Sequence, residues 1–363
     1  MKVLATIVLL VLLAAGAVAG YVWYCIEKPF GNLPPEGVFV QIPHGTSRRA
    51  AAHLLENNGV IRSAIAFEIY ARRHPKRVPV AGEYFFDHPL SGKEVFWKLA
   101  NGEIYQQPFT AREGETMFDI ARELEAAKIM MADEFLKAAS DPVLISDLAP
   151  QAATLEGFLF PATYELPRHP AASDLTRIMV RKFRDTIKQI DPQGPASGVP
   201  ARFHSLLSIV TLASLVERET PKPDERPVVA GVYENRLKKG MFLQCDPTVI
   251  YALEQNDSYT GTLTLKDLHI NSPYNTYVHA GLPPGPIGNP GEASLRAALN
   301  PEPSKYLYFV ANTQGGHFFA ATLAEHNKNV AKYHRLLNGE PADPPETHVS
   351  HKQAASPAHK GKR

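Results

Sequence analysis

The stretch TLASLVERET, residues 211–220, decides how the surrounding chain is interpreted. Its small and apolar first half is followed at once by Glu217, Arg218 and Glu219. Apolar residues recur at helical spacing over 202–220 and cover most faces of the wheel, so this segment is predicted to form one buried helix. A carboxylate is rarely buried without a compensating partner, so the acidic end of this helix needs an explanation.

The two glutamates point in different directions on the helical wheel. Glu219 shares its side with Leu212 and Leu215, whereas Glu217 shares its side with Val210. In one interpretation both carboxylates lie in solvent where the helix surfaces. In the other, one of them lies in an apolar wall, where desolvation raises its pKa and keeps it protonated, as a general acid requires. The wheel alone does not choose between the two residues.

Polar and aromatic side chains gather downstream of this helix. The segment FLQCDPTVIYAL, residues 242–253, places Gln244 and Asp246 in a turn before a β-branched run. The segment NSPYNTYVHAGLPPGPIGNPG, residues 271–291, is too rich in Pro and Gly for a helix or a central strand, and we predict a long binding loop. Its short hydrogen-bonding side chains beside flat aromatic rings suit sugars.

Histidines raise the question of a metal. The segment YLYFVANTQGGHFFAATLAEHN, residues 306–327, predicts a strand and a Gly-Gly turn, with His317 and His326 nearby. These two and His279 have no standard zinc spacing, and the chain has no phosphate-binding or dinucleotide fingerprint. The sequence therefore predicts neither a metal nor a cofactor.

Composition sets the broad class. The chain has 363 residues, 44% hydrophobic and 21% charged, which is enough for two or three globular domains. A net charge of +1 argues against nucleic acid as a partner. Two cysteines, Cys25 and Cys245, cannot form a disulfide framework and are treated as incidental.

The N-terminal segment predicts membrane attachment. Residues 3–24 carry no charge and are long enough to span a bilayer, with Trp23 and two tyrosines suited to the interface. A cleaved signal peptide is the alternative, since residues 17–19 are small. The apolar run continues past that site, which favours a retained anchor. Lys2 places the N-terminus in the cytoplasm and the remaining chain in the periplasm.

A weak repeat follows the anchor. GTSRRAAAHLLENNGVI begins at Gly45 and GETMFDIARELEAAKIM begins at Gly114, and in each a Gly turn leads to a Ser or Thr cap and an amphipathic helix. Extended segments precede both units. The pattern is either two ordinary strand-turn-helix units or a LysM-like carbohydrate-binding module.

Other segments complete the organisation. We predict a strand over 78–86, a basic amphipathic helix over 175–190 and a linker over 192–203. Residues 339–363 are rich in Pro, His and Lys and are predicted to be a disordered tail.

Four segments of this chain, in their order, resemble the endolytic murein transglycosylases, the YceG-like family. They are LASLVERET, LQCDPTVIYAL, SPYNTYVHAGLPPGPIGNPG and YLYFVANTQGGHFF. The resemblance covers the chain from the anchor to about residue 327. It implies cleavage of the β-1,4 bond between N-acetylmuramic acid and N-acetylglucosamine inside glycan strands, leaving 1,6-anhydro-muramoyl ends. It also implies that Glu219 is the catalytic acid and base.

The resemblance further implies that residues of the downstream loops bind the glycan. These are Gln244, Asp246, Ser272, Tyr274, Asn275, Thr276, Tyr277, Asn289 and His317. It raises the expectation of a LysM-like region after the anchor. Glu217 is left as a structural residue, although the sequence does not exclude it as the acid.

We therefore expect an α+β protein of the inner membrane, acting on nascent strands. Its expected parts are a transmembrane anchor (1–25), a LysM-like region (36–140), a catalytic domain (141–338) and the tail. The alternatives are a hydrolase that uses water on the same glycan and a non-catalytic peptidoglycan-binding scaffold. Peptidoglycan strands are the expected partner, and the location makes cell-wall synthases candidates.

Overall fold

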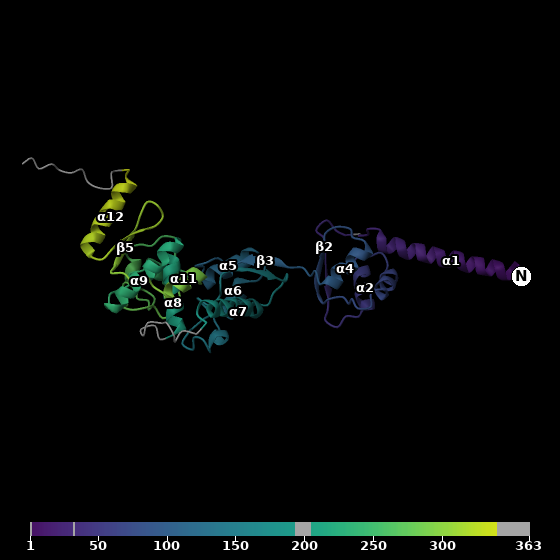
Figure 1. The fold of residues 1–363 in the computed structure, drawn as a ribbon, viewed down its shortest axis with the longest axis horizontal. Helices are drawn as coiled ribbons and strands as arrows, with labels where there is room; N and C mark the ends of the chain where they lie inside the picture. Colours follow the sequence, from purple (N-terminus) through teal and green to yellow (C-terminus); the bar gives the residue numbers. More distant parts are fainter. Residues whose placement is uncertain (1, 32, 193–204, 340–363) are drawn as a thin grey trace, which may run out of the picture. The chain divides into compact units, whose positions relative to one another are not determined.

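A computed structural model describes residues 2–31, 33–192 and 205–339 of the chain. These form two compact units: residues 1–109 with 163–170, and residues 110–162 with 171–363 (Figure 1). Helices and short two-stranded sheets occur in both, so the expected α+β class is confirmed. The predicted linker and tail lie almost entirely outside the described residues.

The first unit packs helices around a small sheet. Strands β1 and β2 pair antiparallel, with Val40 opposite Tyr84. Alternate side chains of both strands face the core, as a half-buried sheet requires. The elements in chain order are α1 (Lys2–Glu27), β1 (Val38–Ile42), α2 (Arg48–Asn57), α3 (Ala64–Arg72), β2 (Gly82–Phe86), α4 (Gly92–Asn101), β3 (Gln107–Thr110) and β4 (Thr163–Leu166). The predicted strand over 78–86 is confirmed in its second half.

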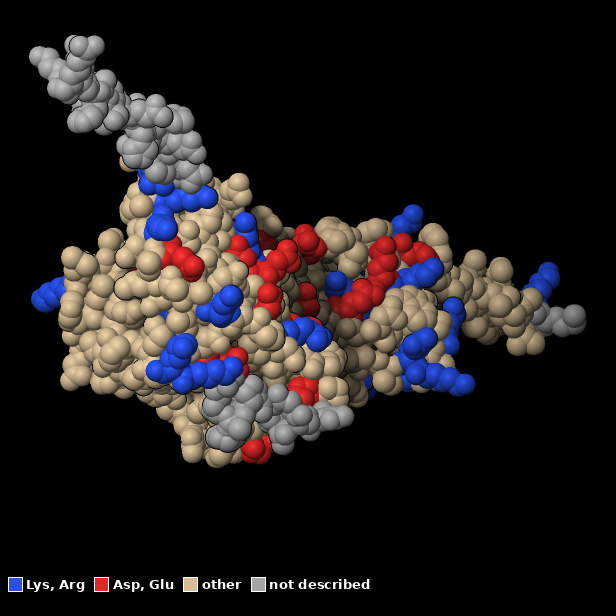
Figure 2. Space-filling view, turned by 60° about the vertical axis from the view of Figure 1, so that its left-hand side comes forward, with Lys and Arg blue, Asp and Glu red and all other residues tan. Residues whose placement is uncertain are grey.

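Helix α1 is the apolar N-terminal segment. Its 26 residues are long and apolar enough to cross a membrane. Figure 2 shows it as a rod of tan atoms with blue only near its end, where Lys2 lies. Its last turn is buried against the first unit through Cys25 and Ile26. The helix therefore continues directly into the folded part.

The two repeated segments have the same local structure. Gly45 and Gly114 have φ of 79° and 81°, the left-handed region that glycine tolerates best. Ser47 caps α2, and Thr116 forms a capping box with Asp119 at the start of α5 (Met117–Ala126). The predicted repeat is thus confirmed as a local motif, but its two copies belong to different compact units.

The second unit is built around α8, in which all residues from Leu206 to Val216 except Ser208 are buried. Helices α9, α10 and α11 pack on it. The elements are α5 (Met117–Ala126), α6 (Ala132–Ala139), η1 (Pro142–Ile145), α7 (Ala172–Ile190), α8 (Leu206–Glu219), η2 (Pro223–Glu225), α9 (Arg226–Lys238), α10 (Asp246–Glu254), η3 (Asp267–His269), α11 (Glu292–Leu299), β5 (Tyr308–Ala311), β6 (His317–Ala320) and α12 (Leu323–Leu337).

Several sequence predictions in this unit are confirmed. The amphipathic helix is α7, the β5–β6 hairpin turns through Gly315, and 271–291 contains no helix or strand. The segment after Cys245 differs from the expected turn and β-branched run, because it forms α10 with Pro247 in its first turn.

The boundary between units differs from the expected division at residue 140. Residues 110–140 belong to the second unit. The loop before α11 holds the start of α5 in this unit through two backbone hydrogen bonds. The Gly114 N–H donates to the Asn289 carbonyl at 2.8 Å, and the Asn289 N–H donates to the Glu115 carbonyl at 2.9 Å. These contacts are distant in sequence, so composition alone does not reveal them.

Candidate active site

Glu219 lies in a pocket at the end of α8. The pocket has a volume of about 400 Å³ and is lined by residues of α8, α9, the 243–246 segment, the loop at 277, the β5–β6 hairpin and, through His326, α12. The Tyr233 hydroxyl, from α9, donates a hydrogen bond to Glu219 Oε1 at 2.6 Å. One carboxyl oxygen is thereby held by the protein.

The surroundings of Glu219 favour its protonated form. Burial raises the pKa of Glu219, and the nearby carboxylate of Asp246 raises it further. Hydrogen bonds from Tyr233 and Cys245 and the proximity of His317 act in the opposite direction. Cys245, expected to be incidental, is therefore part of the surroundings of this carboxyl. A carboxylic acid that keeps its proton near neutral pH can act as a general acid.

One wall of the pocket comes from the segment before α10. Gln244 is exposed and has φ of 52°, an uncommon conformation for a residue with a side chain. Such local strain costs about 1–3 kcal/mol and is concentrated at functional sites. Asp246 begins α10, and one of its oxygens accepts a hydrogen bond from the Tyr277 hydroxyl.

The opposite wall comes from the hairpin. The Phe309 ring meets His317 edge to face, with ring centroids 5.2 Å apart. Glu225 holds His317, since its Oε2 lies 2.8 Å from Nδ1 and its Oε1 accepts from the His317 N–H at 3.1 Å. Arg236 is buried and donates to the carbonyls of Leu307 and Leu243 at 2.6 and 2.7 Å. The two walls are thus fixed to each other through α9.

The structure separates the predicted binding residues into two groups. Gln244, Asp246, Tyr277 and His317 line the pocket with Glu219. The remaining five contact other parts of the fold: Ser272, Tyr274, Asn275, Thr276 and Asn289.

These five residues hold the loops in place. Asn275 donates to the carbonyls of Leu268 and Ile270, at 3.1 and 2.9 Å. The Thr276 hydroxyl accepts from the Cys245 N–H at 3.0 Å. Tyr274 packs against Tyr251 with the two rings tilted and their centroids 5.0 Å apart, and the Ser272 hydroxyl accepts from the Tyr274 N–H at 3.3 Å.

Asn289 connects segments distant in sequence. Its side-chain oxygen accepts from the N–H groups of Gly157 and Leu159, at 2.9 and 3.0 Å. Its amide nitrogen donates to Glu156 at 2.9 Å. Every polar atom of this side chain is therefore occupied within the protein.

Glu217 lies on another side of α8 and is paired. Its Oε1 lies 2.6 Å from Arg226, and the two side chains are only 4% and 6% exposed. Its Oε2 accepts from the Gly291 N–H at 2.9 Å. A buried ion pair of this kind holds α8, α9 and the 281–291 loop together, which is a structural role.

A third buried carboxyl, Glu156, was not singled out from the sequence. It accepts hydrogen bonds from the Met117 N–H, at 3.0 Å, and from the Tyr251 hydroxyl, at 3.2 Å. Burial raises the pKa of Glu156 to about 8. The sequence does contain a signal for Glu156, because it is a lone carboxylate within the apolar run LEGFLF. The same kind of signal, a carboxylate beside an apolar run, drew attention to Glu219.

Glu156 should make stability fall as pH rises. The folded state keeps a proton on Glu156 up to about pH 8, whereas the unfolded chain releases it near 4.5, so the free energy of unfolding falls as the pH rises between these values. The free energy of unfolding should drop by up to about 4 kcal/mol between pH 5 and 8, because each pKa unit is worth about 1.4 kcal/mol. Urea unfolding of Glu156→Gln should show a flatter pH dependence. The exposed control Glu292→Gln should keep the slope, and an unchanged slope in Glu156→Gln would assign it to another group.

Comparisons with known proteins agree with this architecture. The model of the YceG-like family matches residues 40–332. A curated relative, the endolytic murein transglycosylase of Bacillus subtilis (strain 168), is 34% identical over 313 residues, 82% of this chain and 84% of the relative. The protein of the same name from Streptococcus pneumoniae serotype 2 (strain D39 / NCTC 7466) is 30% identical over 91% of this chain, which spans 65% of that relative.

A solved structure is also similar. The crystal structure of a YceG-like protein from Listeria monocytogenes matches with a TM-score of 0.53 and 33% identity, over 81% of this chain and 99% of that one. Fold and site together define an α+β protein with an apolar N-terminal helix and a glutamic acid of raised pKa at a pocket. The chain belongs to the YceG-like family.

Proposed function

We propose that this chain is an endolytic murein transglycosylase that cleaves the bond between N-acetylmuramic acid and N-acetylglucosamine inside glycan strands. The observation that carries the proposal is Glu219, a half-buried residue whose carboxyl lines a pocket and whose pKa is raised by desolvation. The printed names of the curated relatives agree with it. The activity belongs to the second compact unit, because every residue of the pocket lies there.

In the proposed reaction one carboxyl serves both steps. Glu219 gives its proton to O4 of the departing N-acetylglucosamine as the C1–O4 bond breaks. The C6 hydroxyl of the muramoyl residue then attacks C1, and its proton passes to Glu219, which restores the acid. The product end is a 1,6-anhydro-muramoyl residue. Because the nucleophile is internal, the pair of carboxylates that most glycosidases need is not required.

The lining residues have separate proposed tasks. Gln244, Asp246, Tyr277 and His317 would bind sugar hydroxyl and N-acetyl groups, since each presents a polar atom at the pocket. Phe309 offers an apolar face on which a sugar ring can lie. The five loop residues would act indirectly, by keeping those side chains in place.

The remaining parts would bring the pocket to its substrate. Helix α1 would remain as a single-pass anchor with its N-terminus in the cytoplasm, so that the chain would meet newly made strands and their synthases on the periplasmic side. The β1–α2–α3–β2 part of the first unit would bind glycan as a LysM-like module. Its support is the repeated Gly-turn-helix motif.

Product mass tests the reaction. Purified glycan strands treated with the full-length chain in mild detergent should yield fragments with anhydro ends, one water lighter than fragments with reducing ends. Reducing ends would make the protein a hydrolase and direct attention to Asp246 as a second carboxylate. Binding without any shortening of the strands would favour the scaffold.

A further inference from the structure

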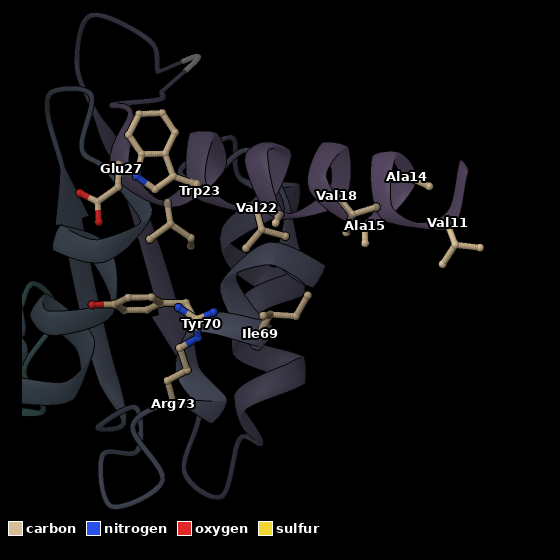
Figure 3. A pocket seen from close by; sticks show the side chains of 12 residues that line it. Val11, Ala14, Ala15, Val18, Val22, Trp23, Glu27, Ile69, Tyr70 and Arg73 are labelled. Carbon is tan, nitrogen blue, oxygen red and sulfur yellow. The ribbon is translucent and has the colours of Figure 1, made fainter. Parts of the chain in front are cut away.

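A groove lies between α1 and the C-terminal end of α3, and its α1 wall continues past α3 toward the N-terminus. Its volume is about 640 Å³, within the range of roughly 300–1,000 Å³ typical of ligand sites. Figure 3 shows Ile69 and Arg73 extending from the C-terminal end of α3 toward α1, with the Tyr70 ring between them and the core. The α1 wall is a stripe of small and apolar residues: Val11, Ala14, Ala15, Val18, Ala19, Val22, Trp23 and Ile26.

The length of the groove matches one leaflet of a bilayer. Val11 and Trp23 are twelve residues apart, which is about 18 Å along a helix. Half of the hydrocarbon core is about 15 Å thick. Trp23 is an aromatic residue suited to the level of lipid headgroups. The apolar stretch of the groove therefore corresponds to one acyl chain.

The other end of the groove carries opposite charges. Arg73 lies on the α3 wall and Glu27 on the α1 wall. Arg73 is exposed, and within the described part of the chain its side chain has no ion pair, whereas the neighbouring Arg72 pairs with Glu68 at 2.7 Å. A guanidinium binds phosphate oxygens well through paired donors.

A separate observation places α3 against lipid. Ile65 and Ile69 lie one turn apart on this helix and are 70% and 36% exposed. Exposed large apolar side chains beside a membrane-spanning helix are stabilised by contact with the bilayer rather than with water.

We propose that the groove between α1 and α3 binds one membrane phospholipid, with an acyl chain along the α1 stripe and the phosphate at Arg73. The inference rests on α1 being retained as a membrane anchor, as proposed above. The bound lipid would fill the space between the anchor and the first unit and so limit rotation of the unit about the anchor.

Native mass spectrometry of the full-length chain, released from membranes in mild detergent, tests this. The chain should retain one phospholipid mass. Ala15→Phe fills the groove and should abolish retention, and Arg73→Ala should reduce it about tenfold, since it removes charge-assisted hydrogen bonds. The matched controls are Ala17→Phe, on the opposite face of α1, and Arg72→Ala. Both should retain the lipid.

Each other outcome overturns the inference. Equal retention in Ala15→Phe and Ala17→Phe would mean that the lipid binds elsewhere. A dimer mass lost only in Ala15→Phe would make the groove an interface with a second copy. A chain mass lacking the N-terminal segment would remove the groove itself. The Glu219 pocket lies in the second unit and the groove in the first, so failure here is distinct from failure of the proposed activity.

Discussion

Glu219→Gln is expected to abolish glycan cleavage while the fold and glycan binding are retained. The amide keeps the shape of the side chain and can still accept the hydrogen bond from Tyr233, but it cannot donate a proton to the leaving oxygen. Loss of a positioned acid–base group costs about 10²–10⁴ in rate, and here one group serves both steps, so the upper end is expected.

The measurement is the rate of appearance of anhydro ends by mass spectrometry, with thermal unfolding measured on the same samples. In the unmodified protein this rate should fall as pH rises above the raised pKa of Glu219, because the acid form is then lost. Residual cleavage within tenfold of the unmodified rate would remove Glu219 from the role of acid and make another carboxyl the candidate.

Glu217→Gln is expected to have the opposite pattern, with a large loss of stability and an active folded fraction. The substitution leaves the buried Arg226 guanidinium without its charge partner, since the other nearby carboxylate, Glu113, lies at 3.5 Å and is half-exposed. Breaking one side of a buried ion pair costs about 3–5 kcal/mol. Urea unfolding at neutral pH measures this loss.

A double variant provides the control. Glu217→Met with Arg226→Met removes both charges at similar volume and should recover most of the lost stability, because no unpaired charge remains buried. Cleavage per folded molecule should stay within a few-fold in each variant. If Glu217→Gln instead unfolded like the unmodified protein but did not cleave, the roles of the two glutamates would have to be exchanged.

Much of the fold could be predicted from local sequence. The Ser47 and Thr116 caps, the Gly turns before them and the apolar spacing of α7 are short-range features, and the structure has all of them. The absence of regular secondary structure in 271–291 could also be predicted from the sequence, because Pro and Gly disfavour helices and central strands in any tertiary context.

The sequence predicted the arrangement of side chains in the candidate site only in part. One pocket is lined by Gln244, Asp246, Tyr277 and His317. Asn275 and Asn289 have the same polar character, but their side chains form hydrogen bonds within the protein. Sequence composition does not distinguish an amide that faces a ligand from one that satisfies buried backbone groups. Tyr233 and Arg236 were missed because both lie in a helix without an unusual pattern.

By itself, the sequence determined that this chain has a membrane-length apolar helix, two capped Gly-turn-helix motifs and a buried helix ending in two carboxylates. Only the tertiary structure decided what each carboxylate does. Arg226 and the Gly291 N–H pair with Glu217, whereas Glu219 meets Tyr233 and an open pocket. The physical reason is that the pKa and the task of a carboxyl depend on partners from distant segments, which helical spacing does not encode.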